Sequence, residues 1–203
     1  ATLFFVLLAS VPMGILAAVK SGHWQDMLLM GLATIGVTIP SFVIASLLIY
    51  CLSFRLKLLP TYGLASLSGY VLPVIALGGY SVSYMARLMR SSLLEVMGQD
   101  YIRTARAKGL TEGAVVFRHA LRNALIPLVT VLGPTIANLL TGSFVVEKIF
   151  AIPGLGVHFV NSVSQRDYTT IMGVTIFYAS FLMGMTLLVD LFYCLIDPRI
   201  RYD

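Results

Sequence analysis

The segment YIRTARAKGLTEGAVVFRHALRNALIPLVTVLGP, residues 101–134, changes from basic to apolar along its length. Its first ten residues place Arg103, Arg106 and Lys108 among small side chains, whereas the run from Ala124 onward is long and apolar enough to be a membrane helix. Between these parts, Thr111 can cap a helix whose first turn contains an acid, where the helix dipole favours a carboxylate. The segment predicts a short polar element that leads directly into a membrane span.

The helix that follows Thr111 is predicted to be amphipathic. Apolar residues recur in it at helical spacing and predict one apolar face, made by Phe117, Leu121, Ala124 and Leu125. A basic stripe is expected on another face, made by Arg118 and Arg122 with His119 beside it.

The composition of the whole chain indicates that lipid is its main solvent. Of the 203 residues, 58% are hydrophobic and only 11% are charged, and the mean hydropathy is +0.90, whereas about a quarter of an ordinary soluble domain is charged. We therefore expect an all-α polytopic membrane protein that forms a single transmembrane domain over residues 1–203. Because the chain begins with Ala1 inside an apolar run rather than with Met, we expect an N-terminally truncated fragment.

Five runs of mostly apolar residues reach the length of about 20 residues that a membrane helix needs. They cover approximately residues 1–19, 27–53, 70–86, 124–146 and 169–195. The first run has no basic segment ahead of it, which favours a span over a signal peptide. Prolines in or beside the runs are expected to bend their helices, namely Pro12, Pro40, Pro73, Pro127 and Pro134. Small residues four apart predict close helix contacts at Gly14 with Ala18, Gly133 with Ala137 and Ser180 with Gly184.

The distribution of Lys and Arg orients these spans, because positive residues are retained on the cytoplasmic side. Alternate loops hold ten and four basic residues, and the segment 87–123 alone contributes four of the five net positive charges. We therefore expect this segment and the C-terminus to face the cytoplasm, with residues 54–69 and 147–168 on the outer side. Cys51 and Cys194 then lie on opposite sides of the membrane, which excludes a disulfide between them.

Several ordered blocks of the sequence resemble one family. The opening segment is followed by GSFVVEKIFAIPGLG (142–156), RDY (166–168) and the terminal DPRIRY (197–202). Together these blocks are similar to inner-membrane permease subunits of ATP-binding-cassette importers, in the branch that serves oligopeptides, dipeptides and nickel. The resemblance covers nearly the whole chain from Lys20 and is densest from Glu95 to Gly156.

Permeases of this kind share a cytoplasmic coupling motif that reads EAA, three residues, G and later LP. In this chain the frame falls on Arg103, Thr104 and Ala105, with Gly109 at the glycine and Leu121 at the later leucine. Arg103 stands at the glutamate position and Arg122 at the proline position, which are departures from the motif. The resemblance implies that a separate ATPase subunit docks on a coupling element made by Tyr101, Arg103, Thr104, Ala105, Arg106, Ala107, Lys108, Gly109 and Leu121.

The resemblance also implies what the protein does. The chain would form half of a translocation path for peptides in the bacterial inner membrane, working by alternating access. Its partners would be a second homologous permease subunit, two ATPase subunits, an extracytoplasmic solute-binding protein and the lipid bilayer. The sequence has no G-x-x-x-x-G-K-[ST] phosphate loop, so we expect ATP and Mg²⁺ on the ATPase partners, no cofactor on this chain and no enzymatic activity of its own. Dipeptides, longer peptides and nickel remain open as substrates.

A secondary transporter and a non-transport structural membrane subunit are the alternatives. The first would predict ion-coupling polar residues and internal repeats, neither of which is visible in the sequence. Asp190 is the one acid inside a predicted span, and its position near the cytoplasmic end fits an interfacial structural role or a proton relay. His23, His119 and His158 are far apart in the sequence, so catalysis is not expected, and Cys51 and Cys194 form no CxxC pair and indicate no metal site. Nucleic acid is not an expected partner, because acidic residues interrupt the basic segment at Glu95, Asp100 and Glu112.

Overall fold

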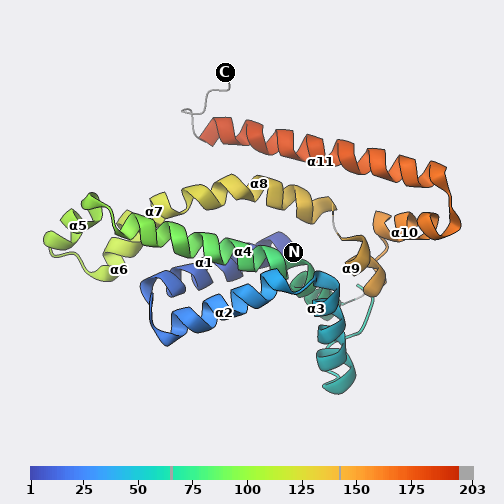
Figure 1. Cartoon of the computed structure of the whole chain (residues 1–203), viewed down its shortest axis with the longest axis horizontal. Helices are drawn as coiled ribbons and strands as arrows, with labels where there is room; N and C mark the ends of the chain where they lie inside the picture. The colour runs from blue at the N-terminus through green and yellow to red at the C-terminus, as the bar shows by residue number, and fades with distance from the viewer. Residues whose placement is uncertain (65, 142, 197–203) are drawn as a thin grey trace. The chain divides into compact units, whose positions relative to one another are not determined.

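The computed structural model describes residues 1–64, 66–141 and 143–196, and every regular element in these ranges is a helix (Figure 1). This confirms the expected all-α fold. In chain order the α-helices are α1 (Thr2–Val19), α2 (Trp24–Thr38), α3 (Ser41–Leu48), α4 (Val71–Met97), α5 (Asp100–Ala107), α6 (Glu112–Ala114), α7 (Leu121–Ala124), α8 (Ile126–Thr141), α9 (Phe144–Ile149), α10 (Leu155–Gln165) and α11 (Tyr168–Ile196). The π-helical segments Ile49–Arg55 and Val115–Ala120 continue α3 and α6, and a 3₁₀ turn, Leu67–Tyr70, precedes α4.

Three helical stretches are long and apolar enough to cross a membrane by themselves: Thr2–Val19, Leu67–Met97 and Tyr168–Leu188. Two further pairs reach this length only when they are counted across a break, namely Trp24–Thr38 with Ser41–Arg55, and Glu112–Ala124 with Ile126–Leu139. The described residues therefore contain three candidate spans, or up to five if each broken pair is one span. Helix α4 also continues through Arg87 and Arg90 to Met97, so these two basic residues belong to a long helix rather than to a loop.

The prolines act differently according to their place in a helix. Pro40 lies between α2 and α3 with extended backbone angles, φ −57° and ψ 143°, and so separates the two helices. Pro73 and Pro127 lie in the first turns of α4 and α8, where a backbone N–H has no partner within the helix, so neither removes a helical hydrogen bond. The bend expected at Pro73 therefore has no basis in a lost bond. The chain does bend beside Pro127, by 49° between Glu112–Ala124 and Ile126–Leu139, as expected. Pro12 and Pro134 lie inside α1 and α8.

The chain divides into two compact units, each with its own core. Unit 1 combines Ala1–Phe5, Ile39–Gly79 and the described part of Gly133–Asp203, and unit 2 combines Val6–Thr38 with Tyr80–Leu132. The core of unit 1 gathers buried residues from α3, α4 and α9 with the residue after α9, namely Ala45, Leu72, Ala76, Val146 and Phe150.

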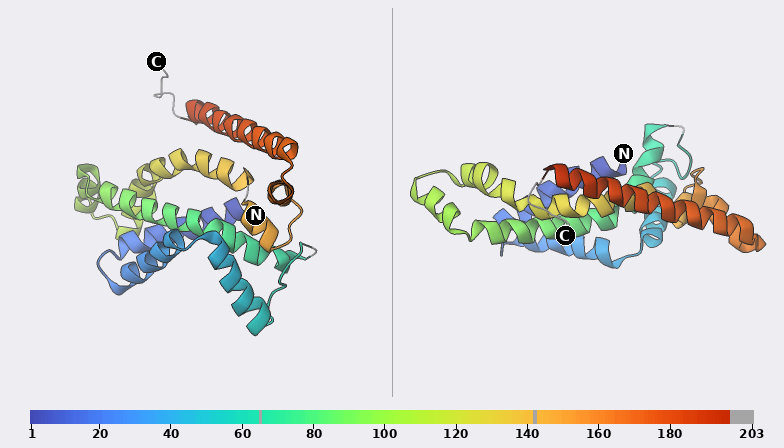
Figure 2. Two further views of the ribbon diagram at one scale, coloured as in Figure 1. Left: turned by 45° about the vertical axis from the view of Figure 1, so that its right-hand side comes forward. Right: turned by 90° about the horizontal axis from the view of Figure 1, so that it is seen from above.

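Unit 2 depends on a close approach between α1 and α4, which Figures 1 and 2 show side by side. A Cβ placed on Gly14 would lie 2.5 Å from Met89 Cβ and 2.7 Å from the carbonyl oxygen of Ala86. Because no Cβ fits there, Gly14 sets the distance between the two helices, and Ala18 one turn later is also buried. This confirms the close contact predicted at Gly14 and Ala18. By contrast, Ser180 and Gly184 are exposed on α11 and make no close helix contact among the described residues.

In unit 1, the start of α10 is held by a carboxylate from α9. The backbone N–H of Gly156 donates a 2.8 Å hydrogen bond to Glu147 Oε2, where the helix N-terminus favours a negative charge. A Cβ on Gly156 would lie 2.6 Å from both Glu147 Oε2 and Phe144 Cα, so only glycine allows this approach. Phe144 in turn packs against Phe159 and Tyr178, with ring centroids 4.7 and 4.8 Å apart.

Candidate functional site

Helix α5 is a short element that packs on the core of unit 2 through one side. Ile102 is fully buried and Ala105, three residues later, is 6% exposed, because residues at this spacing share a helix face. They pack in one cluster with residues of α4 and of the segment after α6, among them Met89, Leu93, Val115, Val116 and Ala120. Ala105 therefore contacts this chain's own core, and its side chain is not available to a partner.

The end of α5 is closed by Gly109. Its φ of +79° is in the left-handed region that glycine adopts without strain. Its N–H donates to the carbonyl of Arg106 at 2.9 Å, and the N–H of Leu110 donates to the carbonyl of Ala105 at 3.4 Å. These two bonds form a Schellman motif, which satisfies the last carbonyls of the helix and turns the chain sharply.

An ion pair joins α5 to α6 across this turn. Arg106 donates from Nε to Glu112 Oε1 at 2.7 Å and from Nη2 to Oε2 at 3.2 Å, so the contact is bidentate. Glu112 lies before the span predicted from residue 124 onward. The hydrogen bond from Arg106 lowers the pKa of its carboxyl below the ordinary value. The pair therefore spans the turn and links the last turn of α5 to the first residue of α6.

Thr111 caps the helix that follows, as the sequence predicts: its side chain accepts a hydrogen bond from the N–H of Ala114 at 3.4 Å. The expected apolar face is only partly correct. Ala124 is buried, and Leu121 and Leu125 are partly buried against the core, but Phe117 is 64% exposed. The reason is the π-helical segment Val115–Ala120, whose wider turns shift the register so that Val115, Val116 and Ala120 face the core instead.

A second link joins α5 to α7. Asn123 Nδ2 donates a 2.8 Å hydrogen bond to the hydroxyl oxygen of Tyr101. The pairing of Tyr101 with Asn123 could not be predicted from the sequence, because the two residues are 22 positions apart. Two of the predicted residues therefore make contacts within this chain. Tyr101 is hydrogen-bonded to Asn123, and Leu121 packs against the core cluster that includes Ile102 and Ala105.

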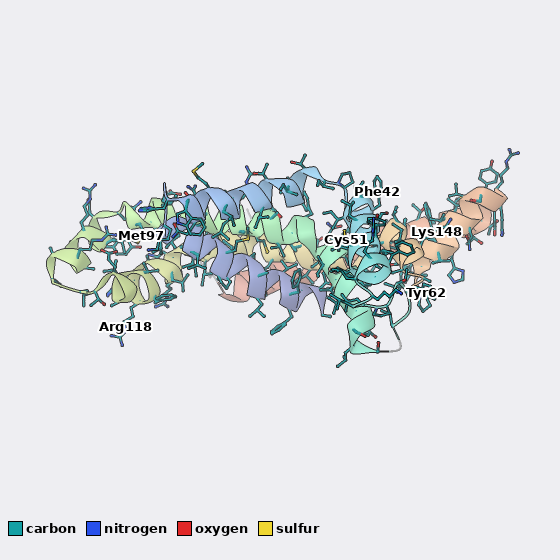
Figure 3. All side chains as sticks on the ribbon, turned by 90° about the horizontal axis from the view of Figure 1, so that it is seen from below. Phe42, Cys51, Tyr62, Met97, Arg118 and Lys148 are labelled. Carbon is teal, nitrogen blue, oxygen red and sulfur yellow. The ribbon has the colours of Figure 1, made fainter. Side chains whose placement is uncertain are left out.

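The remaining predicted residues are exposed on the outer side of α5 and its turn. We call this set the α5 face: Arg103, Thr104, Ala107, Lys108 and Gly109. Arg103 contacts Asp100 at 3.4 Å, but these side chains are 74% and 96% exposed, so the pair contributes little. The expected basic stripe is also exposed, and Figure 3 shows Arg118 pointing away from the ribbon.

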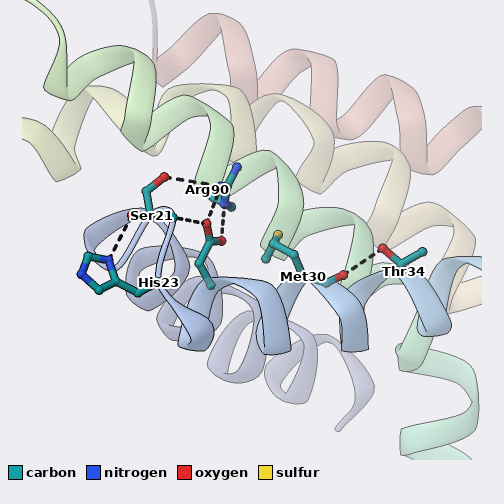
Figure 4. A network of polar contacts seen from close by, with 7 residues as sticks. Ser21, His23, Met30, Thr34 and Arg90 are labelled. Atoms are coloured by element: carbon teal, nitrogen blue, oxygen red, sulfur yellow. Dashed lines mark hydrogen bonds and ion pairs between the residues drawn. The ribbon is translucent and has the colours of Figure 1, made fainter.

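Unit 2 contains a largely buried ion pair that was not predicted from the sequence. Arg90 on α4 donates from Nε and Nη2 to the two carboxylate oxygens of Asp26 on α2, both at 2.6 Å (Figure 4). The N–H of Gly22 adds a 3.0 Å bond to Asp26 Oδ2. No local pattern could reveal this pair, because its partners are 64 residues apart.

Other predicted features contribute no site. The described residues contain no group of three or more His, Cys, Asp and Glu side chains that could hold a metal ion. The side chain of Asp190 and the terminal DPRIRY lie outside the described residues.

The sequence matches a family model described as binding-protein-dependent transport system inner membrane component over residues 10–202. It is 50% identical over 195 residues to the dipeptide transport system permease protein DppB of Bacillus subtilis, covering 96% of this chain and 63% of that protein. It is 43% identical over 199 residues to DppB of Lactococcus lactis (96% and 66%). It is also 44% identical over 201 residues to the glutathione transport system permease protein GsiC of Salmonella typhimurium (99% and 66%). The chain thus spans less than two thirds of the length of these relatives.

Two solved structures have a similar fold. A chain in the crystal structure of an amino acid ABC transporter with histidines aligns with a TM-score of 0.66 and 21% identity, covering 94% of this chain and 87% of that chain. A chain of the MetNI methionine ABC transporter, in inward facing conformations, aligns with a TM-score of 0.68 and 20% identity, covering 93% and 88%. At this level of identity the likeness concerns the fold alone.

Proposed function

Since the chain belongs to the family of binding-protein-dependent transport system inner membrane components, we propose that it is a permease subunit of an ATP-binding-cassette importer for small peptides. It forms half of the translocation path together with a second homologous permease subunit. Two ATPase subunits, which bind ATP and Mg²⁺, drive the alternating access of this path. An extracytoplasmic solute-binding protein delivers the peptide. The names of the relatives, dipeptide and glutathione permeases, support a small peptide as the substrate.

The observation that carries this proposal is the α5 face. It presents small and cationic side chains outward, while Ile102 and Ala105 seat the same helix on the core of unit 2. Small residues let a partner approach closely, and the exposed cations can pair with acidic groups. A partner that fits this face is the ATPase subunit, on the cytoplasmic side of the membrane with the C-terminus of this chain.

The contacts of α5 supply a route by which docking acts on the spans. Ile102 and Ala105 share one core cluster with Val115 and Val116, and α7 and α8 follow these residues along the chain. The Arg106–Glu112 and Tyr101–Asn123 contacts join α5 to the same segment at two further points. A movement of α5 therefore displaces the start of α8 as one body, which suits a switch between two packings of the helices.

A bulky residue at Ala107 tests the proposal. Ala107 is exposed in α5, so Ala107→Trp leaves the packing of this chain intact while it obstructs a partner. In the full-length complex we expect loss of peptide uptake and of ATP hydrolysis stimulated by the binding protein, with unchanged amounts of permease in the membrane. The matched control is His23→Trp, in the exposed turn between α1 and α2. Normal uptake with Ala107→Trp would contradict the assignment of the docking face.

A further inference from the structure

Unit 2 contains a groove of about 460 Å³ whose lining includes no residue of the α5 face. Helix α2 contributes Met30 and Val37 to its lining, and α4 contributes Tyr84, Arg87, Leu88, Arg90 and Ser91. This volume is within the range of small-molecule sites. The groove adjoins the Asp26–Arg90 pair, and Met30 and Thr34 follow along α2 in Figure 4.

Helix α2 has two different faces. Leu28, Leu32 and Ile35 lie on one face at i, i+4 and i+7, and all three are at least half exposed and apolar. Met30, Thr34 and Val37 share a second face at the same spacing, two residues out of step and therefore on roughly the opposite side. The first face suits lipid chains, whereas on the second face Met30 and Val37 line the groove and Thr34 lies between them along the helix.

Helix α4 contributes a polar stripe within a candidate membrane span. Tyr80, Tyr84, Arg87 and Ser91 recur at i, i+4, i+7 and i+11 and all are exposed. The rings of Tyr80 and Tyr84 are parallel, with centroids 6.4 Å apart. Polar and charged side chains within membrane spans mostly face a protein interior or a water-filled cavity, because exposure to lipid is costly.

The two arginines of the groove differ in their partners. Arg90 is neutralised by Asp26, whose two carboxylate oxygens are both occupied. Arg87, one turn earlier, forms no ion pair with any residue that the structure describes. The groove is therefore electropositive at Arg87 and offers no free carboxylate for a cation, so it is suited to the anionic end of a ligand whose cationic group, if it has one, lies outside the groove.

We propose that this groove is part of the translocation path and binds the C-terminal carboxylate of the transported peptide. The Arg87 guanidinium pairs with the carboxylate, which its planar fork can bind in a bidentate way. Tyr84 and Tyr80 pack along the rest of the peptide, and Met30, Val37 and Leu88 give the groove apolar walls. Because only one end of the peptide is recognised, its length can vary. This inference rests on the proposed function and names a substrate subsite within it.

The first test measures whether the groove contains water. Single cysteines are introduced as Thr34→Cys, Tyr84→Cys and, as the lipid-face control, Leu32→Cys, in the full complex with Cys51 and Cys194 replaced by alanine. A thiol must ionise to react, so we expect Thr34→Cys and Tyr84→Cys to react with water-soluble methanethiosulfonates at least about tenfold faster than Leu32→Cys. Equal, slow reaction at all three positions would overturn the proposal, because the groove would then face lipid.

The second test measures the charge that Arg87 contributes. At Tyr84→Cys we expect an anionic methanethiosulfonate to react faster than a cationic one. Arg87→Gln should reduce the ratio of the anionic rate to the cationic rate roughly three- to tenfold. Arg87→Lys should keep most of the ratio, since it keeps the charge. A ratio that does not change with Arg87→Gln would overturn the role given to this residue.

The third test identifies the occupant. The dipeptide Ala-Ala should slow modification of Tyr84→Cys, and its C-terminal amide should not. Equal protection by both compounds, or by neither, would overturn the carboxylate assignment. If phosphatidylglycerol vesicles protect the cysteine and phosphatidylcholine vesicles do not, the groove holds a lipid phosphate and the proposal is wrong. Thiol modification requires no transport, so a complex that fails to import peptide at all would contradict the proposed function separately.

Discussion

Asp26 and Arg90, 64 residues apart, form a bidentate ion pair in which both N–O distances are 2.6 Å. The Asp26 side chain is only 6% exposed and that of Arg90 is 28% exposed, so the pair lies largely out of water. It joins the first turn of α2 to the later part of α4, and its arginine lines the groove together with Arg87. The stability of unit 2 should therefore depend on it.

Removing one partner of this pair is expected to be strongly destabilising. Asp26→Asn leaves the Arg90 charge without a counter-ion in a poorly hydrated place. It should lower the free energy of unfolding by about 3 kcal/mol, because the remaining charge is no longer compensated. The thermal midpoint of the purified complex measures this effect. Asp100→Asn, in the exposed pair with Arg103, is the control and should change the midpoint little. Similar midpoints for both variants would contradict a structural role for Asp26.

Gly14 is expected to tolerate no side chain, because a Cβ would meet Met89 and the Ala86 carbonyl. Gly14→Ala forces α1 and α4 apart and should destabilise the protein by about 1 to 3 kcal/mol. Gly31→Ala on α2 is the matched control, since a Cβ there meets nothing within 4 Å. Thermal unfolding of the two variants should differ clearly, and a Gly14→Ala variant as stable as Gly31→Ala would show that the two helices are not in close contact.

At Gly109 the constraint is the backbone and not space. A Cβ would meet nothing within 4 Å, but φ is +79°, so Gly109→Ala should cost about 1 kcal/mol and loosen the end of α5. Asn accepts the left-handed region better than Ala or Val. ATP hydrolysis stimulated by the binding protein should therefore fall in the order Gly, Asn, Ala, Val. Equal activity for Asn and Val would indicate that this turn is not needed for coupling.

The start of α11 is expected to depend on pH through Asp167, which precedes the span. Asp167 accepts hydrogen bonds from the N–H and the hydroxyl of Thr170, at 3.1 and 2.6 Å, and these bonds lower the pKa of its carboxyl. A folded pKa below the unfolded value means that the stabilisation is present above the unfolded pKa of about 4 and is lost as the pH falls through the folded pKa.

Hydrogen exchange of the Thr170 amide measures this effect. Its protection relative to the amides at the centre of α11 should decline in acid for the wild type. With Asp167→Asn, the protection should be weaker at neutral pH and should not change with acid. A wild-type protein whose relative protection is constant down to the lowest accessible pH would contradict the capping role.

The sequence alone determined the fold class, the basic character of the segment before α8 and the cap at Thr111. These features follow from composition and from spacing within a few residues, which report local hydrogen bonding and the cost of placing charge in lipid.

Only the tertiary structure decided which faces are covered. The π-helical segment Val115–Ala120 turns Phe117 outward, and the core of unit 2 takes Ala105 away from the exposed side of α5. The pairing of Asp26 with Arg90, which leaves Arg87 as the open cation of the groove, likewise arises from contact between distant segments. Such contacts depend on how helices pack in three dimensions, and a pattern that repeats every three or four residues contains no information about them.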